Sequence, residues 1–206
     1  GTATSPGTRM VAVSGHVNRP GVFEIINGIT TFRDLLYGEE FCQGIRNGND
    51  LKAFVPGGGS APWFTPDQLD LPFEASQVGP AGSMLGSGAI MVMDSTTDIP
   101  RAALTLTRFY AHESCGQCSP CREGTGWMEK VLHRLENGHG TMEDITLLEE
   151  INKKIEGNTI CPLGDAAAWP VAAAIRHFRE EFEWHVTHPA EAQTRNYGLI
   201  QPRVEE

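Results

Sequence analysis

The chain has 206 residues, of which 40% are hydrophobic, which is enough for one large domain or two small ones with a real core. Sixteen Lys and Arg against twenty-six Asp and Glu give a formal net charge of -10, and this disfavours a nucleic-acid partner, whose phosphates need a basic surface. No apolar run approaches the roughly eighteen residues needed to span a bilayer, so we expect no direct membrane insertion.

Cysteine usage indicates a reducing compartment. Three of the five cysteines fall within seven residues, unlike the scattered, even set of a secreted disulfide scaffold. The chain begins at Gly1 without an initiator Met and reaches a strand-like pattern by Met10. We therefore expect a fragment or a processed piece of a longer protein.

Residues 1–97 are rich in Gly and Pro and contain short strand-like runs. The run MVAVSGHV (10–17) alternates small, apolar and polar residues, and VFEII (22–26) is β-branched and aromatic. The tripeptide RPG at 19–21 supplies a turn between them. This pattern predicts a hairpin.

The same region contains a short helix and two more strands. Thr31 is the expected cap of a helix that ends at Gly38. The segments 52–58 and 89–94 are strand-like, and a long stretch with four prolines separates them. A few strands with one short helix predict a small α+β domain of β-grasp type over residues 1–97.

From Asp98 the pattern changes to helix. Four amphipathic segments follow, and short loops join them, which predicts an antiparallel four-helix bundle over 98–185. The expected signals are a start at Asp98 and Pro100, a second helix over 126–138, a third capped by Thr141, and a fourth after Cys161-Pro162 with Asp165 as cap. Trp127, Trp169, Phe178 and Trp184 are expected in the bundle core. The tail at 186–206 has no helical period and is predicted to be extended.

Three thiols lie at intervals of three in the segment ESCGQCSPCREG, at Cys115, Cys118 and Cys121. Bacterial ferredoxins use this C-x2-C-x2-C run to hold a four-iron four-sulfur cluster, which takes four Cys thiolates in all. Cys161, which precedes Pro162 as in the C-P dipeptide of the ferredoxins, is the predicted fourth ligand. Two helices that run out and back would return Cys161 to the loop. A helix that starts near Gly124 would add a favourable dipole, and Arg122 a positive charge.

Other readings of these residues remain open. Zinc also takes four cysteines, although structural zinc sites usually present two separated pairs, so a zinc-stapled interaction module without redox activity is the alternative. Cys42 is expected to be a small buried residue and not a ligand. His112 is expected to be a solvated helix-end residue, and His177, His185 and His188 surface residues.

Four segments resemble a known family: ESCGQCSPCREGT, CPLGDAAAWPV, SGHVNRPGVFE and AGSMLGSGAIMVMD. Together they are similar to the carboxy-terminal half of the NADH-binding flavoprotein subunits of respiratory complex I, an oxidoreductase, and the resemblance covers nearly the entire chain. It implies a soluble-ligand-binding β-grasp domain, followed by a helical bundle that holds one 4Fe-4S cluster. Residue by residue, the family's cluster ligands fall on Cys115, Cys118, Cys121 and Cys161.

The resemblance also implies a function. In the family, FMN takes hydride from NADH, and single electrons leave through the cluster toward clusters in partner subunits of the peripheral arm, including a 2Fe-2S thioredoxin-like subunit and the large iron-sulfur subunit. This places the protein on the cytoplasmic side of the inner membrane, or on the matrix side in a eukaryote. FMN and NADH bind to a preceding domain, so we expect no catalytic residue here and no NADH oxidation by this chain alone. Flavoprotein subunits of NAD-dependent hydrogenases and formate dehydrogenases share these motifs and are the alternative.

Overall fold

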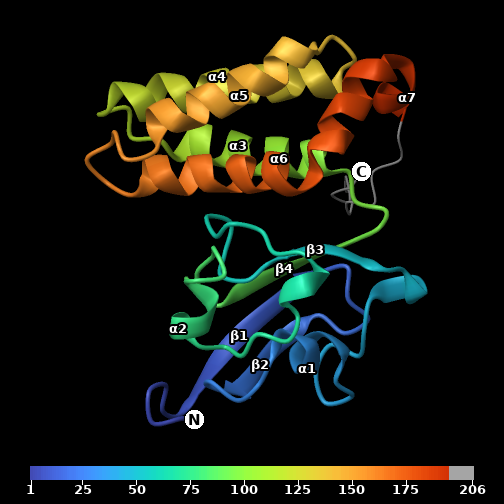
Figure 1. Ribbon diagram of the computed structural model, residues 1–206, viewed down its shortest axis with the longest axis vertical. Helices are drawn as coiled ribbons and strands as arrows, with labels where there is room; N and C mark the ends of the chain where they lie inside the picture. The colour runs from blue at the N-terminus through green and yellow to red at the C-terminus, as the bar shows by residue number, and fades with distance from the viewer. Residues whose placement is uncertain (195–206) are drawn as a thin grey trace, which may run out of the picture.

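A computed structural model describes residues 1–194 as a four-stranded sheet beside several helices (Figure 1). The strands are β1 (Thr8–Gly15), β2 (Gly21–Ile26), β3 (Leu51–Val55) and β4 (Ala89–Asp94). Their order in the sheet is β2-β1-β4-β3. The central pair, β1 and β4, is parallel, and each edge strand is antiparallel to its neighbour. The predicted hairpin between the first two strands is confirmed, as are the two later strands.

The sheet buries both of its faces because alternate residues of β3 and β4 point to opposite sides. Phe54 and Val92 join a core on the side of the sheet that packs against α1 (Phe32–Tyr37). Val55 and Met93 join a second core that continues into the helices. The sheet therefore lies between two cores, one shared with α1 and the other shared with the long helices.

The short helix α1 begins as the sequence predicted. Thr31 and Asp34 form a capping box: the backbone N–H of Thr31 donates to the Asp34 carboxylate at 2.9 Å, and the backbone N–H of Asp34 donates to the Thr31 hydroxyl at 3.0 Å. Phe32 places its ring 4.2 Å from that of Phe73 and 5.0 Å from that of Phe54, measured between centroids. These rings fill the core between α1 and the sheet.

The helical region follows β4 and lies on one side of the sheet. Figure 1 shows α3 and α6 next to the sheet and α4 and α5 in a layer farther from it. The long helices are α3 (Ile99–Glu113), α4 (Ser119–Glu136), α5 (Met142–Ile155) and α6 (Leu163–Thr187). The predicted starts hold at two of them: Asp98 accepts the N–H of Arg101 at 2.9 Å, and Thr141 forms a capping box with Asp144. Short turns occupy the long connections: η1 (Arg46–Gly48), η2 (Pro66–Gln68) and α2 (Ala75–Val78).

The fourth long helix differs from the prediction at its start. Asp165 is not its cap, because α6 begins at Leu163, with Pro162 in the cap position. Asp165 lies in the first turn, and its carboxylate accepts the backbone N–H of Gly157 at 2.7 Å, which ties the end of α5 to the start of α6. Pro170 lies inside the helix, and the backbone departs from helical angles at Phe178.

The extended tail predicted for 186–206 is wrong over its described part. Helix α6 continues to Thr187, and α7 (Pro189–Thr194) follows it. Proline is favoured in the first turn of a helix, and Ala192 is buried, so packing stabilises a helix that has no amphipathic period of its own. The rest of the predicted tail, 195–206, lies outside the described residues.

Three aromatic predictions also need correction. Trp127 is 54% exposed and does not belong to the core. Trp169 and Trp184 are half-buried: the indole N–H of Trp169 donates to Glu156 at 2.8 Å, and Trp184 stacks on His188. The core between the helices consists instead mainly of Met128, Leu132 and other aliphatic residues from all four helices, together with the buried rings of Tyr110 and Phe182.

Among the described residues, none of the helices has the length and apolar character needed to cross a bilayer.

Candidate metal centre

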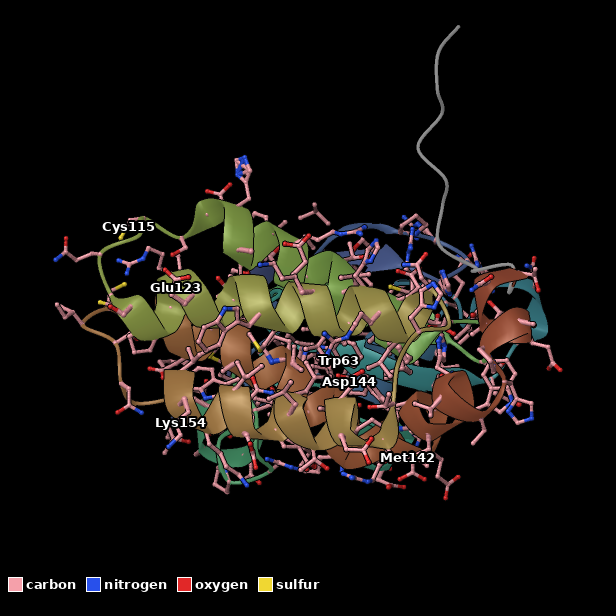
Figure 2. The ribbon with its side chains drawn as sticks, turned by 90° about the horizontal axis from the view of Figure 1, so that it is seen from above. Trp63, Cys115, Glu123, Met142, Asp144 and Lys154 are labelled. Carbon is pink, nitrogen blue, oxygen red and sulfur yellow. The ribbon has the colours of Figure 1, made fainter. Side chains whose placement is uncertain are left out.

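The cysteine loop joins the end of α3 to the start of α4. Ser114 caps α3, Cys115 follows it, and Cys118 is the cap residue of α4. Helix α4 begins at Ser119, and not near Gly124 as the sequence suggested, so Cys121 lies in its first turn. Figure 2 shows Cys115 on this loop, at the end of the molecule where Glu123 also lies.

Cys161 reaches the same place from the other side. Helices α4 and α5 run out and back, and the chain between α5 and α6 places Cys161 directly before Pro162. Cys115, Cys118, Cys121 and Cys161 all line one small cavity of about 20 Å³, together with Ser114, Gln117, Thr159 and Leu163. The structure thus brings together all four residues that the sequence singled out.

Backbone contacts give each side of the cavity its shape. Gly116 has a positive φ of 80°, which glycine adopts without strain, and its carbonyl accepts Nη1 of Arg122 at 2.8 Å. On the other side, the hydroxyl of Thr159 donates to the carbonyl of Cys161 at 2.8 Å. A Cβ on Gly164 would lie 2.5 Å from the Thr159 side chain, so only glycine allows this close approach.

The four thiols differ in exposure. Cys121 is 7% exposed, Cys118 is intermediate, and Cys115 and Cys161 are exposed. The two less exposed sulfurs have hydrogen-bond partners: Ser114 Oγ lies 3.3 Å from Cys121 Sγ, and the backbone N–H of Ile160 donates to Cys118 Sγ at 3.4 Å. One side of the donor set is thus held by the protein and the other side faces the surface.

The chemistry of this donor set suits an anionic iron-sulfur centre. Thiolates are soft ligands for iron-sulfur clusters and for zinc. The N-terminal turn of α4 points its positive dipole end at the sulfurs, and Arg122 is held over the loop through Gly116. The helix dipole favours negative charge at the cavity, whereas the charge of Arg122 is shared with the carboxylate of Glu123, which accepts its Nε–H at 2.8 Å.

The positions of the side chains do not favour a single ion. Over residues 1–194, no three His, Cys, Asp or Glu side chains converge closely enough to hold one metal ion. Tetrahedral zinc requires each sulfur at about 2.3 Å from the metal. The four thiols share one cavity, and four Cys thiolates are the number of ligands that a 4Fe-4S cluster takes.

Cys42 lies apart from these four, as the sequence predicted. It is fully buried in the core between α1 and the sheet. Burial raises the pKa of the Cys42 thiol to about 12, an effect that the charge of Arg19 only partly opposes. A thiol with such a pKa stays protonated and is a poor ligand.

The histidines divide into exposed and buried residues. His112, His177 and His188 are exposed, as expected. The prediction for His185 is wrong, because this residue is fully buried, and its Nε2 lies 2.7 Å from Oδ2 of Asp98. The sequence did contain a signal: His185 follows Phe182 by three residues, and this spacing places both on the same buried face of α6.

Sequence reasoning also missed two polar features, one at the cysteine cavity and one in the sheet region. The contact of Ser114 with Cys121 depends on how α3 ends, and the only signal is a serine directly before the first cysteine. The second is a buried network around Asp94, whose carboxylate accepts from His16, Asn49 and Thr96. Its residues come from distant segments, so no local pattern reveals it.

Comparison with known proteins agrees with this site. Residues 101–185 match the family model described as the NADH-ubiquinone oxidoreductase-F iron-sulfur binding region. The F subunit of the NADH-quinone oxidoreductase of Mycobacterium bovis is 48% identical over 186 residues, which cover 90% of this chain and 41% of that protein. The corresponding protein of Rickettsia rickettsii is 48% identical over 201 residues, 97% of this chain and 45% of that protein. This chain therefore spans less than half the length of these curated relatives.

A solved structure has the same fold. A chain in the crystal structure of an NAD+-reducing [NiFe]-hydrogenase in the air-oxidized state superposes with a TM-score of 0.79 at 29% sequence identity. The match covers 90% of this chain and 31% of that chain.

Proposed function

We propose that Cys115, Cys118, Cys121 and Cys161 hold one 4Fe-4S cluster, since residues 101–185 match the family model of the NADH-ubiquinone oxidoreductase-F iron-sulfur binding region. The cluster would accept single electrons from FMN that NADH has reduced, and pass them to further clusters. The protein would act as part of an NADH:quinone oxidoreductase. The observation that supports this proposal best is the single cavity that all four thiols line.

The residues of this chain hold and shield the centre. When bound, the cluster supplies a one-electron carrier whose potential depends on hydrogen bonds, charge and burial. Cys121 and Leu163 line the cavity, and the first turn of α4 favours negative charge on the thiolates. No general acid, base or nucleophile is needed for this task.

The finer description of the fold is part of the same proposal. The parallel central pair of β1 and β4, with α1 across one face, supports a β-grasp domain over about residues 1–97. Helices α3 to α6 pack around one aliphatic core, which supports a four-helix bundle over about 98–185. The cysteine cavity would then lie at one end of the bundle, away from the sheet's own core.

The complete enzyme would require more than this chain. FMN and NADH would bind to a domain outside these residues. Partners would be other peripheral-arm subunits, including a 2Fe-2S thioredoxin-like subunit and the large iron-sulfur subunit, on the cytoplasmic side of the inner membrane or, in a eukaryote, on the matrix side. The two exposed thiols, Cys115 and Cys161, mark the side of the cavity that a partner could approach.

A second candidate is the equivalent subunit of an NAD-dependent hydrogenase. The structural match to an NAD+-reducing [NiFe]-hydrogenase favours it. The sequence identity of 48% to the quinone oxidoreductase relative of Mycobacterium bovis, against 29% to the hydrogenase chain, favours the quinone oxidoreductase. Isolation of the complex that contains this chain distinguishes the two: the first reduces quinone with NADH, whereas the second reduces NAD+ with hydrogen.

The cluster itself is tested on the purified chain after anaerobic reconstitution with iron and sulfide. We expect iron and acid-labile sulfide in equal amounts, a brown absorption shoulder that dithionite bleaches, and an EPR signal in the reduced protein. The chain should not reduce ferricyanide with NADH. A colourless chain that binds zinc in preference to iron would contradict the proposal.

A further inference from the structure

Ser114 contacts a sulfur of the proposed centre through its hydroxyl. Its oxygen lies 3.3 Å from Cys121 Sγ, within hydrogen-bond distance for sulfur. Ser114 caps α3, and its backbone N–H donates to the carbonyl of Tyr110 at 3.0 Å. The helix therefore fixes the position from which the hydroxyl reaches Cys121.

The direction of this hydrogen bond depends on the protonation state of Cys121, because either atom can donate when the thiol is protonated. The backbone N–H of Gly116 donates to Ser114 Oγ at 3.4 Å, which occupies one lone pair of this oxygen and is compatible with donation of its proton to the sulfur. The positive φ of Gly116 turns the loop back for this contact, and Arg122 holds the Gly116 carbonyl. A cysteine that binds iron is deprotonated and can only accept, so Ser114 must donate.

We infer that Ser114 donates a hydrogen bond to the cluster-bound sulfur of Cys121 and raises the reduction potential of the cluster; this inference rests on the proposed function. Reduction adds negative charge to the cluster and its thiolates, and a donor at sulfur stabilises the more negative state. Cys121 is 7% exposed, so water competes little for its sulfur. Ser114 acts through Cys121 and is a positioning residue.

The test compares three variants of the reconstituted chain by redox titration followed by EPR. In Ser114→Ala, the ratio of reduced to oxidised cluster at a fixed potential should fall by about two- to tenfold, the range expected for one hydrogen bond. A tenfold change corresponds to about 59 mV for a one-electron couple. Ser114→Thr keeps the hydroxyl and should keep the wild-type potential.

Ser119→Ala is the matched control. Ser119 lies in the same cysteine segment, is exposed, and its hydroxyl contacts Arg122 at 3.5 Å. Its loss should leave the potential unchanged. A shift as large in Ser119→Ala as in Ser114→Ala would overturn the inference, because the effect would then be general to the loop.

The outcomes separate a failure of this inference from a failure of the proposed cluster binding. A wild-type chain that binds no iron overturns the proposed function and this inference with it. A cluster that forms in Ser114→Ala with the wild-type potential overturns the inference alone. If Ser114→Ala loses the cluster, a Ser114→Thr variant that keeps it at the wild-type potential supports the hydroxyl, while loss in both variants overturns the inference.

Discussion

The sheet region and the cysteine end of the helical region both hold groups that favour negative charge, but they surround them differently. In the sheet region, the Asp94 carboxylate is fully buried and accepts from His16 at 2.8 Å, Asn49 at 2.9 Å and Thr96 at 2.6 Å. Arg46 adds a fourth contact at 3.3 Å. At the cysteine end, four thiols line one cavity, and two of them are exposed.

This difference separates a structural polar group from a chemical one. The oxygens of Asp94 are directed at donors from the segments that follow β1 and β4 and from the chain before β3, so the carboxylate joins these segments. The thiols direct soft lone pairs into a common space at the junctions between helices. We therefore expect loss of Asp94 to affect folding, and loss of a thiol to affect metal binding.

The largest effect is expected for Cys161→Ala. Cys161 is exposed, so its substitution removes little packing, but it removes the only proposed ligand outside the loop. The reconstituted variant should lose the 4Fe-4S signal, and its melting temperature should fall to that of the metal-free chain, because metal binding and folding are coupled. Iron analysis and thermal unfolding measure both effects.

Cys42→Ala is the control for a lost thiol. Cys42 is fully buried in the other core, so this variant should be less stable and still bind iron at the wild-type level. Full iron content with an unchanged melting temperature in Cys161→Ala would contradict the proposed ligand set.

Asp94→Ala should have the next largest effect. The substitution leaves His16, Asn49 and Arg46 directed at a missing acceptor, and removal of one partner of a buried ion pair costs about 3–5 kcal/mol. Urea unfolding of the metal-free chain measures this loss. Asp70→Ala is the control: Asp70 is 74% exposed and pairs with Arg33 at the surface, where such pairs contribute at most about 1 kcal/mol.

The same carboxylate predicts a dependence of stability on pH. Burial alone would raise the pKa of Asp94, but hydrogen bonds from Thr96, Asn49 and His16 hold it well below its usual range. A depressed carboxyl pKa stabilises the folded state fully above the unfolded value of about 3.9, and this contribution disappears as the pH falls toward and through the folded pKa. Acid titration of the free energy of unfolding should show a smaller decline below pH ~4 in Asp94→Asn than in the wild type. Equal declines in the two proteins would show that the folded state does not stabilise the charged form of the Asp94 carboxylate.

Local sequence signals predicted most of the elements, because each of these rests on residues close in sequence. The capping boxes at Thr31 and Thr141 and the start at Asp98 are of this kind. The 39 residues between Cys121 and Cys161 form a helical out-and-back path, and this geometry made the fourth thiol predictable. That the thiols bind a cluster stays a prediction.

The errors arose where tertiary contacts decide the outcome. Trp127 was expected in the core because of its apolar side chain, but it lies on the outer face of α4 beside buried Met128. His185 was expected at the surface because of its polarity, but Asp98 satisfies it in the interior. Helix α7 has no period of its own and depends on the burial of Ala192.

The smallest effects are expected from two glycines of α4, and they test how tightly the two cysteine-bearing junctions are packed. A Cβ on Gly124 would lie 2.7 Å from Cγ1 and Cδ1 of Ile155, a buried residue at the end of α5, whereas a Cβ on Gly126 would meet nothing within 4 Å. Gly124→Ala should therefore destabilise the chain by about 1–3 kcal/mol through overpacking. Gly126→Ala should stabilise it by up to about 1 kcal/mol, since alanine favours helix.

Urea unfolding of the metal-free chain gives the sign of each effect, and iron content after reconstitution shows whether the thiols still converge. Because Ile155 lies just before the segment that leads to Cys161, we expect Gly124→Ala to retain less iron than Gly126→Ala. If both variants were equally stable and bound equal iron, the close approach of α4 and α5 would not position Cys161. The claim that helix packing assembles the cysteine end of the molecule would then be wrong.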